Sequence, residues 1–273
     1  MVMRVTEKND ITLYQFESPA FESVTTFVTT RHNHARTASA RGDFNLGLYC
    51  GDDVTLVENN LQQLCMALGI GRSQLFYPRQ VHGHEVRTID ADFIALSHDE
   101  QLKALDGVDA IITNIPGVAI AVTTADCVPV ILYDAVRGVV AAIHAGWRGT
   151  AQEIVKHTIE AMNAQFGTQP CDIQAGIGPC IGVEAYEVGD EVFDAMRTAD
   201  INIDSITIRN KTTQKMHIDL AAANADQLLH AGVDLMNIEV CGICTHRNSA
   251  DFYSVRALGN ETGRFLTGVM LKK

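Results

Sequence analysis

The chain has 273 residues, of which 47% are hydrophobic, so it can bury a substantial core within one domain. Its formal net charge of -12 and its pI near 5.2 exclude the broad basic surface on which nucleic-acid binding depends. No apolar stretch is long enough to span a bilayer, and residues 1–10 lack the apolar core of a secretory signal, so we expect a cytoplasmic protein with no membrane partner.

Hydrophobic periodicity predicts strands and helices that alternate along the chain. We expect strands at residues 24–29, 110–113, 118–122, 128–133, 138–143, 173–176 and 238–241. A first helix follows Asp52-Asp53, carries apolar residues at helical spacing and ends at Gly69, and further helices are expected at residues 150–166, 190–196 and 220–230. Only four residues separate strands 128–133 and 138–143, which is too short for a helical crossover and predicts an antiparallel hairpin. The pattern indicates an α/β protein with a mixed sheet.

The chain contains no proline-rich, glycine-rich or charged linker, and no repeat of solenoid period. We therefore expect a single domain over residues 1–273. Seven cysteines, an odd number scattered over a chain of this length, argue against a disulfide framework and indicate reduced thiols.

Polar groups that bind metals follow three of the apolar segments. The run 138–143 leads directly to His144, in a segment that also holds the single tryptophan. The run 118–122 leads to Cys127, and the patch 75–77 leads to His82. Two imidazoles and a thiolate are donors that zinc prefers, and three protein ligands leave the fourth tetrahedral position open, which is the arrangement of a catalytic site. The sequence therefore predicts a metal centre of His82, Cys127 and His144.

Other cysteines and histidines have competing interpretations. Cys241 to His246 has the spacing of half a structural zinc site, but there is no second Cys-x-x-Cys, so we expect these cysteines to pack in the interior. Cys180 lies in a glycine-rich turn and is either a nucleophile or part of a structural loop that lines the pocket; we favour the loop. His32 and His34 have the spacing to reach a metal together from a strand, although a solvated loop is the commoner location for such a pair.

An anion site is predicted where the helix expected at residues 150–166 follows the tryptophan segment. Free amide groups and the helix dipole favour an anion there, and Arg148 stands at this entrance. The alternative is that Arg148 stacks on Trp147 or caps the helix. Arg79 is a second motif arginine able to bind phosphate.

The motifs together resemble one known family from end to end. The segments that carry the resemblance are, in order, Asn45-Leu46-Gly47, Gln80 to Gly83, Ala125 to Val130, His144 to Gly149, Gly178 to Gly182, Cys244-Thr245 and Thr262-Gly263-Arg264. Their order and spacing are similar to those of the YfiH/laccase-domain family. Two departures are visible: Thr30-Arg31 is followed by His32-Asn33-His34 instead of a glycine pair, and Arg256 stands where the family commonly has two arginines.

The resemblance implies a layered α/β sandwich with mixed β-sheets and a zinc-dependent purine nucleoside enzyme. Such an enzyme would phosphorolyse adenosine, inosine, guanosine or methylthioadenosine with inorganic phosphate, and would deaminate adenosine. Asp126 would then move protons, Arg148 or Arg79 would hold phosphate, and Asn45 and Gln80 would position sugar hydroxyls or base edges.

Three alternatives remain open. The resemblance also includes copper-dependent polyphenol oxidases, but a laccase relay needs more histidine ligands than these motifs supply. The other two are a factor that edits peptidoglycan precursors and a non-catalytic protein that binds a nucleotide-sugar.

Overall fold

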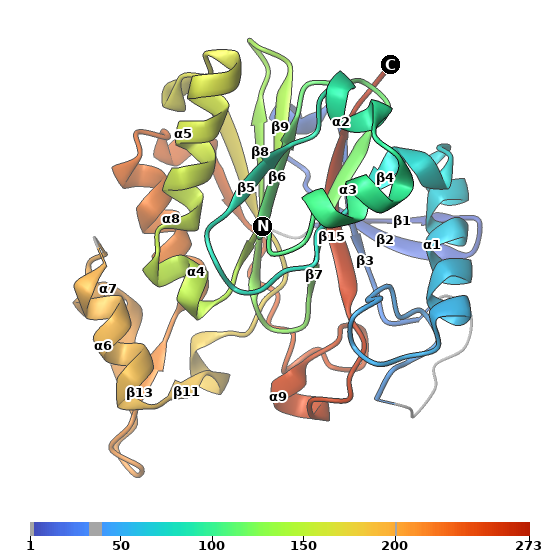
Figure 1. Cartoon of the computed structure of the whole chain (residues 1–273). Helices are drawn as coiled ribbons and strands as arrows, with labels where there is room; N and C mark the ends of the chain where they lie inside the picture. The colour runs from blue at the N-terminus through green and yellow to red at the C-terminus, as the bar shows by residue number, and fades with distance from the viewer. Residues whose placement is uncertain (1–2, 33–39, 200) are drawn as a thin grey trace.

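Two β-sheets packed face to face form the centre of the molecule (Figure 1). The computed structural model describes residues 3–32, 40–199 and 201–273. The first sheet has the order β1 (Arg4–Lys8), β2 (Ile11–Gln15), β3 (Val24–Thr29), β15 (Phe265–Leu271), β7 (Ala119–Thr124) and β4 (Leu75–Phe76). The second has the order β14 (Ile238–Val240), β10 (Ile173–Ile177), β8 (Val128–Asp134), β9 (Val139–Ala145), β6 (Ala110–Thr113) and β5 (Val86–Thr88). Both sheets contain parallel and antiparallel pairs, so the prediction of mixed sheets is confirmed.

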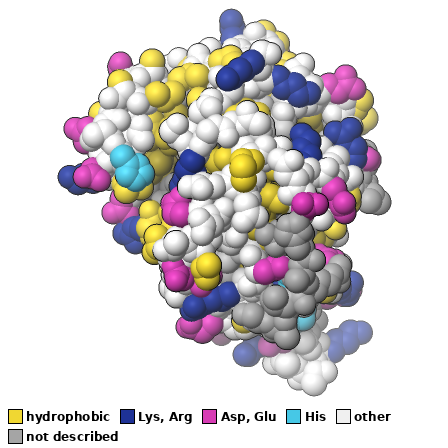
Figure 2. Space-filling model, turned by 90° about the vertical axis from the view of Figure 1, so that its right-hand side faces the viewer, with side chains coloured by type: hydrophobic (Ala, Val, Ile, Leu, Met, Phe, Trp, Pro, Cys, Tyr) yellow, Lys and Arg dark blue, Asp and Glu magenta, His cyan; other side chains and the backbone are white. Residues whose placement is uncertain are grey.

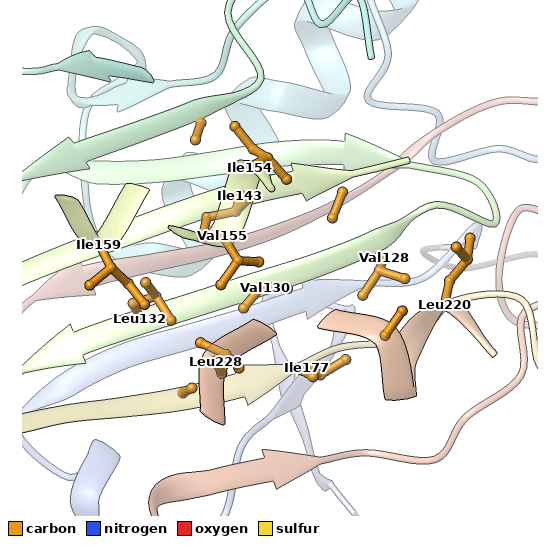
Figure 3. Close-up of a cluster of buried hydrophobic side chains, with 14 of the residues drawn as sticks. Val128, Val130, Leu132, Ile143, Ile154, Val155, Ile159, Ile177, Leu220 and Leu228 are labelled. Carbon is orange, nitrogen blue, oxygen red and sulfur yellow. The ribbon is translucent and has the colours of Figure 1, made fainter. Parts of the chain in front are cut away.

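Helices cover the two outer faces and complete a layered α/β sandwich. Helix α1 (Val54–Leu68) packs on the first sheet, and α5 (Ile154–Phe166) with α8 (Leu220–His230) packs on the second (Figure 1). Because successive side chains of a strand point to opposite faces, Val130 of β8 faces the helices whereas Ile131 faces the first sheet. The side chains between β8, β10, α5 and α8 form one continuous apolar cluster (Figure 3).

A small third sheet lies beside this sandwich. It consists of β11 (Glu187–Val188), β13 (Met216–Ile218) and β12 (Thr207–Arg209). Helices α6 (Asp190–Thr198) and α7 (Ile203–Ile206) lie between β11 and β12 in the chain. The remaining helices are α2 (Ala91–Ala95), α3 (His98–Ala104), α4 (Trp147–Ala151) and α9 (Val255–Leu258). Short 3-10 turns occur at Pro19–Phe21, Arg72–Gln74, Pro170–Asp172, Val183–Ala185 and Leu235–Asn237.

The structure confirms the predicted bounds of the first helix and the predicted hairpin. The Asp53 side chain accepts a hydrogen bond from the Thr55 amide and begins α1, and Gly69 ends it in the left-handed conformation with φ of 72°. Strands β8 and β9 pair antiparallel across a tight turn, as the four-residue spacing requires. By contrast, periodicity predicted neither the third sheet nor β15, the strand at the centre of the first sheet.

The prediction of one continuous helix over residues 150–166 was wrong. The chain forms α4, leaves the helix at Gln152 and Glu153, where Glu153 has φ of 58°, and resumes as α5. In a continuous helix the Thr150 carbonyl would accept from residue 154, but here it accepts from the Gln227 side chain of α8 at 2.6 Å and from the Glu153 amide at 3.0 Å. A tertiary contact therefore divides the helix.

Charges of both signs are interspersed on the surface. On the face that carries α1, basic and acidic side chains alternate with apolar ones (Figure 2). Within the described residues, no helix is long and apolar enough to cross a membrane.

Candidate metal centre and its cavity

The three predicted metal ligands converge. His144 lies near the end of β9, Cys127 lies in the turn between β7 and β8, and His82 lies in the loop that follows β4. One donor atom of each residue lies within 4.8 Å of the others. Among the described residues this is the one group of three or more histidine, cysteine or carboxylate side chains close enough to hold a metal ion. The two imidazole rings meet edge to face, with centroids 4.8 Å apart.

The donor set and the space between its members fit a metal ion. Two nitrogens and a sulfur suit zinc, and also suit copper, as a three-ligand site. Gly146 follows the last residue of β9, and a Cβ atom there would lie 2.7 Å from His82 Cδ2 and 3.3 Å from Cys127 Sγ. The absence of a side chain at residue 146 therefore keeps room for the ligands.

The charges of the centre favour a thiolate beside an imidazolium when no metal is bound. Burial raises the pKa of Cys127, but attraction to His144 and hydrogen bonds from both histidines outweigh it, so the net shift is downward. Burial lowers the pKa of His144, and the Cys127 thiolate and the Asp109 carboxylate reverse this into a net rise. His144 Nδ1 lies 2.7 Å from Asp109 Oδ1. A carboxylate only accepts, so Nδ1 carries the proton and Nε2 is left for a metal.

A cavity of about 410 Å³ opens over these ligands. Its wall is formed by the metal ligands and by Gly47, Tyr49, Cys50, Gln80, Thr123, Thr124, Ala125, Asp126, Ile181, Tyr186, Val255, Arg256 and Arg264. Asp126 is the only carboxylate in this described lining, and Arg256 and Arg264 are its only guanidinium groups. The cavity is of a size that holds a small organic substrate.

Asp126 has the most direct connection to the metal centre, since it precedes Cys127. It adopts a left-handed backbone with φ of 98°. Its Oδ1 accepts from the Thr245 hydroxyl at 2.7 Å, and its Oδ2 accepts from the Arg256 amide at 2.8 Å. These two donors fix the carboxylate at the cavity wall.

The two predicted neutral amides are both hydrogen-bonded to residues of the cavity wall. The Gln80 side chain donates to the Thr123 carbonyl at 2.8 Å, and its Oε1 accepts from the Thr123 amide at 2.8 Å. Asn45 is buried; its Oδ1 accepts from the Arg264 amide at 2.8 Å, and its Nδ2 donates to Asp52 at 2.8 Å. Asn45 lies behind the lining residues.

Arg79 and Arg148 lie outside the cavity lining. Arg79 is exposed and pairs with Asp106 at 2.5 Å. Arg148 is also exposed, and its guanidinium lies 4.1 Å from the centroid of the Trp147 ring. This is the stacking arrangement that the sequence left open as the alternative to phosphate binding.

Within the described part of the chain, the other cysteines and histidines that the sequence singled out do not join the centre. The backbones of Cys180 and Cys244 pair in an isolated parallel β-bridge, and both thiols are free. The Cys244 Sγ accepts a hydrogen bond from the Gly182 amide at 3.1 Å. Cys241 is buried, as expected for a packing role. His32 is held by Asp43 and by the Ala250 carbonyl, each at 2.9 Å, and His34 lies outside the described residues.

Sequence reasoning did not assign a role to four residues around the site. Arg264 and Arg256 were noticed only as parts of motifs, and neither Tyr186 nor Asp109 was noticed. Arg264 Nη1 donates to the Thr262 and Gly263 carbonyls at 2.7 and 2.8 Å. The Arg256 guanidinium lies 5.4 Å from the Tyr186 ring centroid. The sequence holds one signal for Asp109: this acidic residue stands directly before the apolar run 110–113, which is a buried strand.

The chain is similar over most of its length to proteins of one family. Residues 25–272 match the family model described as multi-copper polyphenol oxidoreductase laccase. The chain is 44% identical over 251 residues to the protein named adenosine deaminase RL5, from an unknown prokaryotic organism, which covers 92% of this chain and 95% of that protein. It belongs to the YfiH/laccase-domain family.

Two further relatives of this family cover nearly the whole chain. The purine nucleoside phosphorylase of Bacteroides thetaiotaomicron is 38% identical over 254 residues, which are 93% of this chain and 94% of that protein. The crystal structure of YlmD from Geobacillus stearothermophilus superimposes with a TM-score of 0.88 at 30% identity and covers 100% of this chain and 99% of that one. The matched ranges span positions 82, 127 and 144.

Proposed function

We propose that this YfiH-family chain is a single-domain, zinc-dependent enzyme of purine nucleosides. It would phosphorolyse adenosine, inosine, guanosine or methylthioadenosine and would deaminate adenosine. The observation that carries the proposal is the convergence of His82, Cys127 and His144 beneath a cavity of about 410 Å³. The names of the relatives, adenosine deaminase and purine nucleoside phosphorylase, support the choice of substrate.

The three ligands would hold zinc and leave one coordination position directed to the cavity. When bound, zinc would supply a Lewis acid at the cavity floor, which is what hydrolytic removal of an amino group from a purine requires. Asp126 is the carboxylate positioned to accept and return a proton at its Oδ atoms, since it is the only carboxylate in the described lining. The Thr245 hydroxyl and the Arg256 amide keep it in place.

Phosphate would bind on the side of the cavity formed by Arg264 and Arg256. Two carbonyl groups hold Nη1 of Arg264, so its planar guanidinium is fixed before an anion arrives. The Arg256 guanidinium is fixed in the same way by the Ala185 and Glu187 carbonyls. We therefore transfer to these two arginines the phosphate role that the sequence suggested for Arg148 and Arg79.

Gln80 and Asn45 would shape the cavity wall. The side-chain nitrogen of Gln80 donates to Thr123 at the end of β7 and its oxygen accepts from Thr123, while Asn45 accepts from the main-chain amide of Arg264. Gln80 lines the cavity and would keep its second Nε2 hydrogen for contact with a nucleoside, whereas Asn45 is not among the described lining residues.

Product analysis tests the proposal. Protein of verified metal content is incubated with adenosine, with and without inorganic phosphate. We expect inosine under both conditions, and free purine base with ribose-1-phosphate only when phosphate is present. Base release at the same rate without phosphate would make the enzyme a hydrolase and would remove the role of the arginines.

The same experiment separates the alternatives. Two histidines and a cysteine also suit copper, so metal analysis of the purified protein decides between zinc and copper, and oxygen consumption with a polyphenol tests oxidase activity. If neither nucleosides nor polyphenols are converted, editing of peptidoglycan precursors or nucleotide-sugar binding becomes the better interpretation.

A further inference from the structure

One buried carboxylate connects the two histidine segments of the metal centre. Asp109 is 0% exposed and precedes β6. Its Oδ1 lies 2.7 Å from His144 Nδ1 and also accepts from the His82 amide at 3.0 Å. Its Oδ2 accepts from the Gly83 amide at 2.7 Å and from the Val81 amide at 3.2 Å. Four donors, three of them consecutive backbone amides, therefore surround one side chain.

The loop that these amides belong to is strained. His82 has φ of 64°, a left-handed conformation that is uncommon for a residue with a side chain. Such a conformation persists only where surrounding contacts over-determine it. The amides on both sides of His82, and its own, all donate to Asp109, so the carboxylate supplies those contacts.

Asp109 also holds His144 through both its main chain and its side chain. The His144 amide donates to the Asp109 carbonyl at 2.8 Å, because β6 pairs with β9, and the carboxylate fixes which ring nitrogen carries the proton. The same residue thus sets the backbone of one ligand and the ring orientation of the other.

We propose that Asp109 is a positioning residue that forms the metal centre before any metal binds. The inference rests on the proposed metal binding at His82, Cys127 and His144, but it concerns the metal-free protein. The substitution Asp109→Asn replaces one carboxylate oxygen with an NH2 group of similar size, and since each oxygen accepts from two donors, two of the four donors lose their acceptor. The strained loop is then free to relax, and metal binding must reorder it.

Three measurements on metal-free protein and on zinc-loaded protein test this proposal. A zinc titration against a competing chelator should show an affinity about 10- to 100-fold lower for Asp109→Asn than for the wild type. Hydrogen exchange of the amides at residues 81–83 should be slow in the wild type with or without zinc. In Asp109→Asn it should be fast without zinc and slow with it. In the zinc-loaded wild type, nitrogen NMR of the His144 ring should place its one proton on Nδ1, the atom that faces Asp109.

Asp106→Asn is the matched control, since Asp106 is an exposed acid three residues earlier that pairs with Arg79. Its zinc affinity and exchange should equal those of the wild type. A zinc affinity of Asp109→Asn within threefold of wild type would overturn the proposal. Hydrogen exchange of the wild-type amides at residues 81–83 tests the proposal without any substitution, so it remains valid even if Asp109→Asn does not fold. Rapid exchange of these amides without zinc would mean that the loop is not preformed, and would overturn the proposal. Wild-type protein that binds no zinc while its amides stay protected would instead count against the proposed function alone.

Discussion

Gly146→Ala should disturb the metal centre without disturbing the fold. The new Cβ atom would lie 2.7 Å from His82 Cδ2, about 0.7 Å closer than the 3.4 Å at which ordinary contact begins. It would also lie 3.3 Å from Cys127 Sγ. One or both ligands must therefore move by several tenths of an ångström. Metal sites tolerate deviations of only about 0.2 Å in ligand distance, so the displacement is large on the scale that matters.

The backbone at residue 146 accepts alanine readily. Its φ of -71° and ψ of 170° are ordinary extended values, so the substitution causes no backbone strain. Overpacking costs about 1–3 kcal/mol when the surroundings cannot yield, but His82 lies in an exposed part of the loop and can shift. We expect zinc affinity to fall about 10- to 100-fold, as for loss of a contact that orients a ligand, with a small change in melting temperature.

Zinc titration with a competing chelator and a melting curve of the metal-free protein measure the two effects. Gly71→Ala is the matched control: Gly71 also precedes a helical turn, with φ of -79° and ψ of 157°, and a Cβ there would meet nothing closer than 3.6 Å. If Gly146→Ala binds zinc as tightly as Gly71→Ala does, the space at residue 146 is not part of the metal centre.

Three further outcomes are expected. Cys127→Ser should lose most of the bound zinc in metal analysis and keep its fold, whereas Cys241→Ser should keep one zinc per chain; a loss in the second variant alone would revive a structural site at that cysteine. Arg264→Gln should lower kcat/KM for phosphorolysis about 100-fold and leave deamination unchanged, and Arg79→Gln should change neither; the opposite result would return the phosphate role to Arg79. Removal of metal with a chelator should expose the Cys127 peptide to alkylation by iodoacetamide in mass spectrometry, and zinc should restore its protection; equal labelling in both states contradicts ligation by this thiol.

Local patterns predicted the elements whose apolar residues follow one period. Helix α8 and strand β6 have the expected bounds, and α1 ends at the expected glycine. Strand β15 is buried along its whole length, as the predicted β8 and β9 are, but it was missed because Thr267 and Gly268 interrupt its apolar run. That glycine is needed by tertiary packing, since the Phe27 ring occupies the place of a Cβ.

The convergence of His82, Cys127 and His144 was predictable because each follows an apolar run, and family motifs selected these candidate ligands from the other cysteines and histidines. The residues that orient them were not predictable from such runs. Asp109 acts on residues 81–83 and on His144, which lie 26 to 28 and 35 positions away along the chain. Arg264 reaches the cavity because its amide bonds Asn45, 219 positions away. No local pattern encodes such pairs.

Backbone strain also indicates that the geometry of the site depends on contacts between distant segments. Among the described residues, six that are not glycine have a positive φ, and two of these, His82 and Asp126, line the cavity. His82 is a candidate metal ligand and Asp126 adjoins one. Each is held by groups from distant segments, His82 by Asp109, and Asp126 by Thr245 and the Arg256 amide. Neither conformation is favoured by its own sequence, so both depend on the completed fold. The geometry of this centre is therefore a product of the packed sheets, and substitutions that loosen those distant hydrogen bonds should weaken metal binding before they unfold the chain.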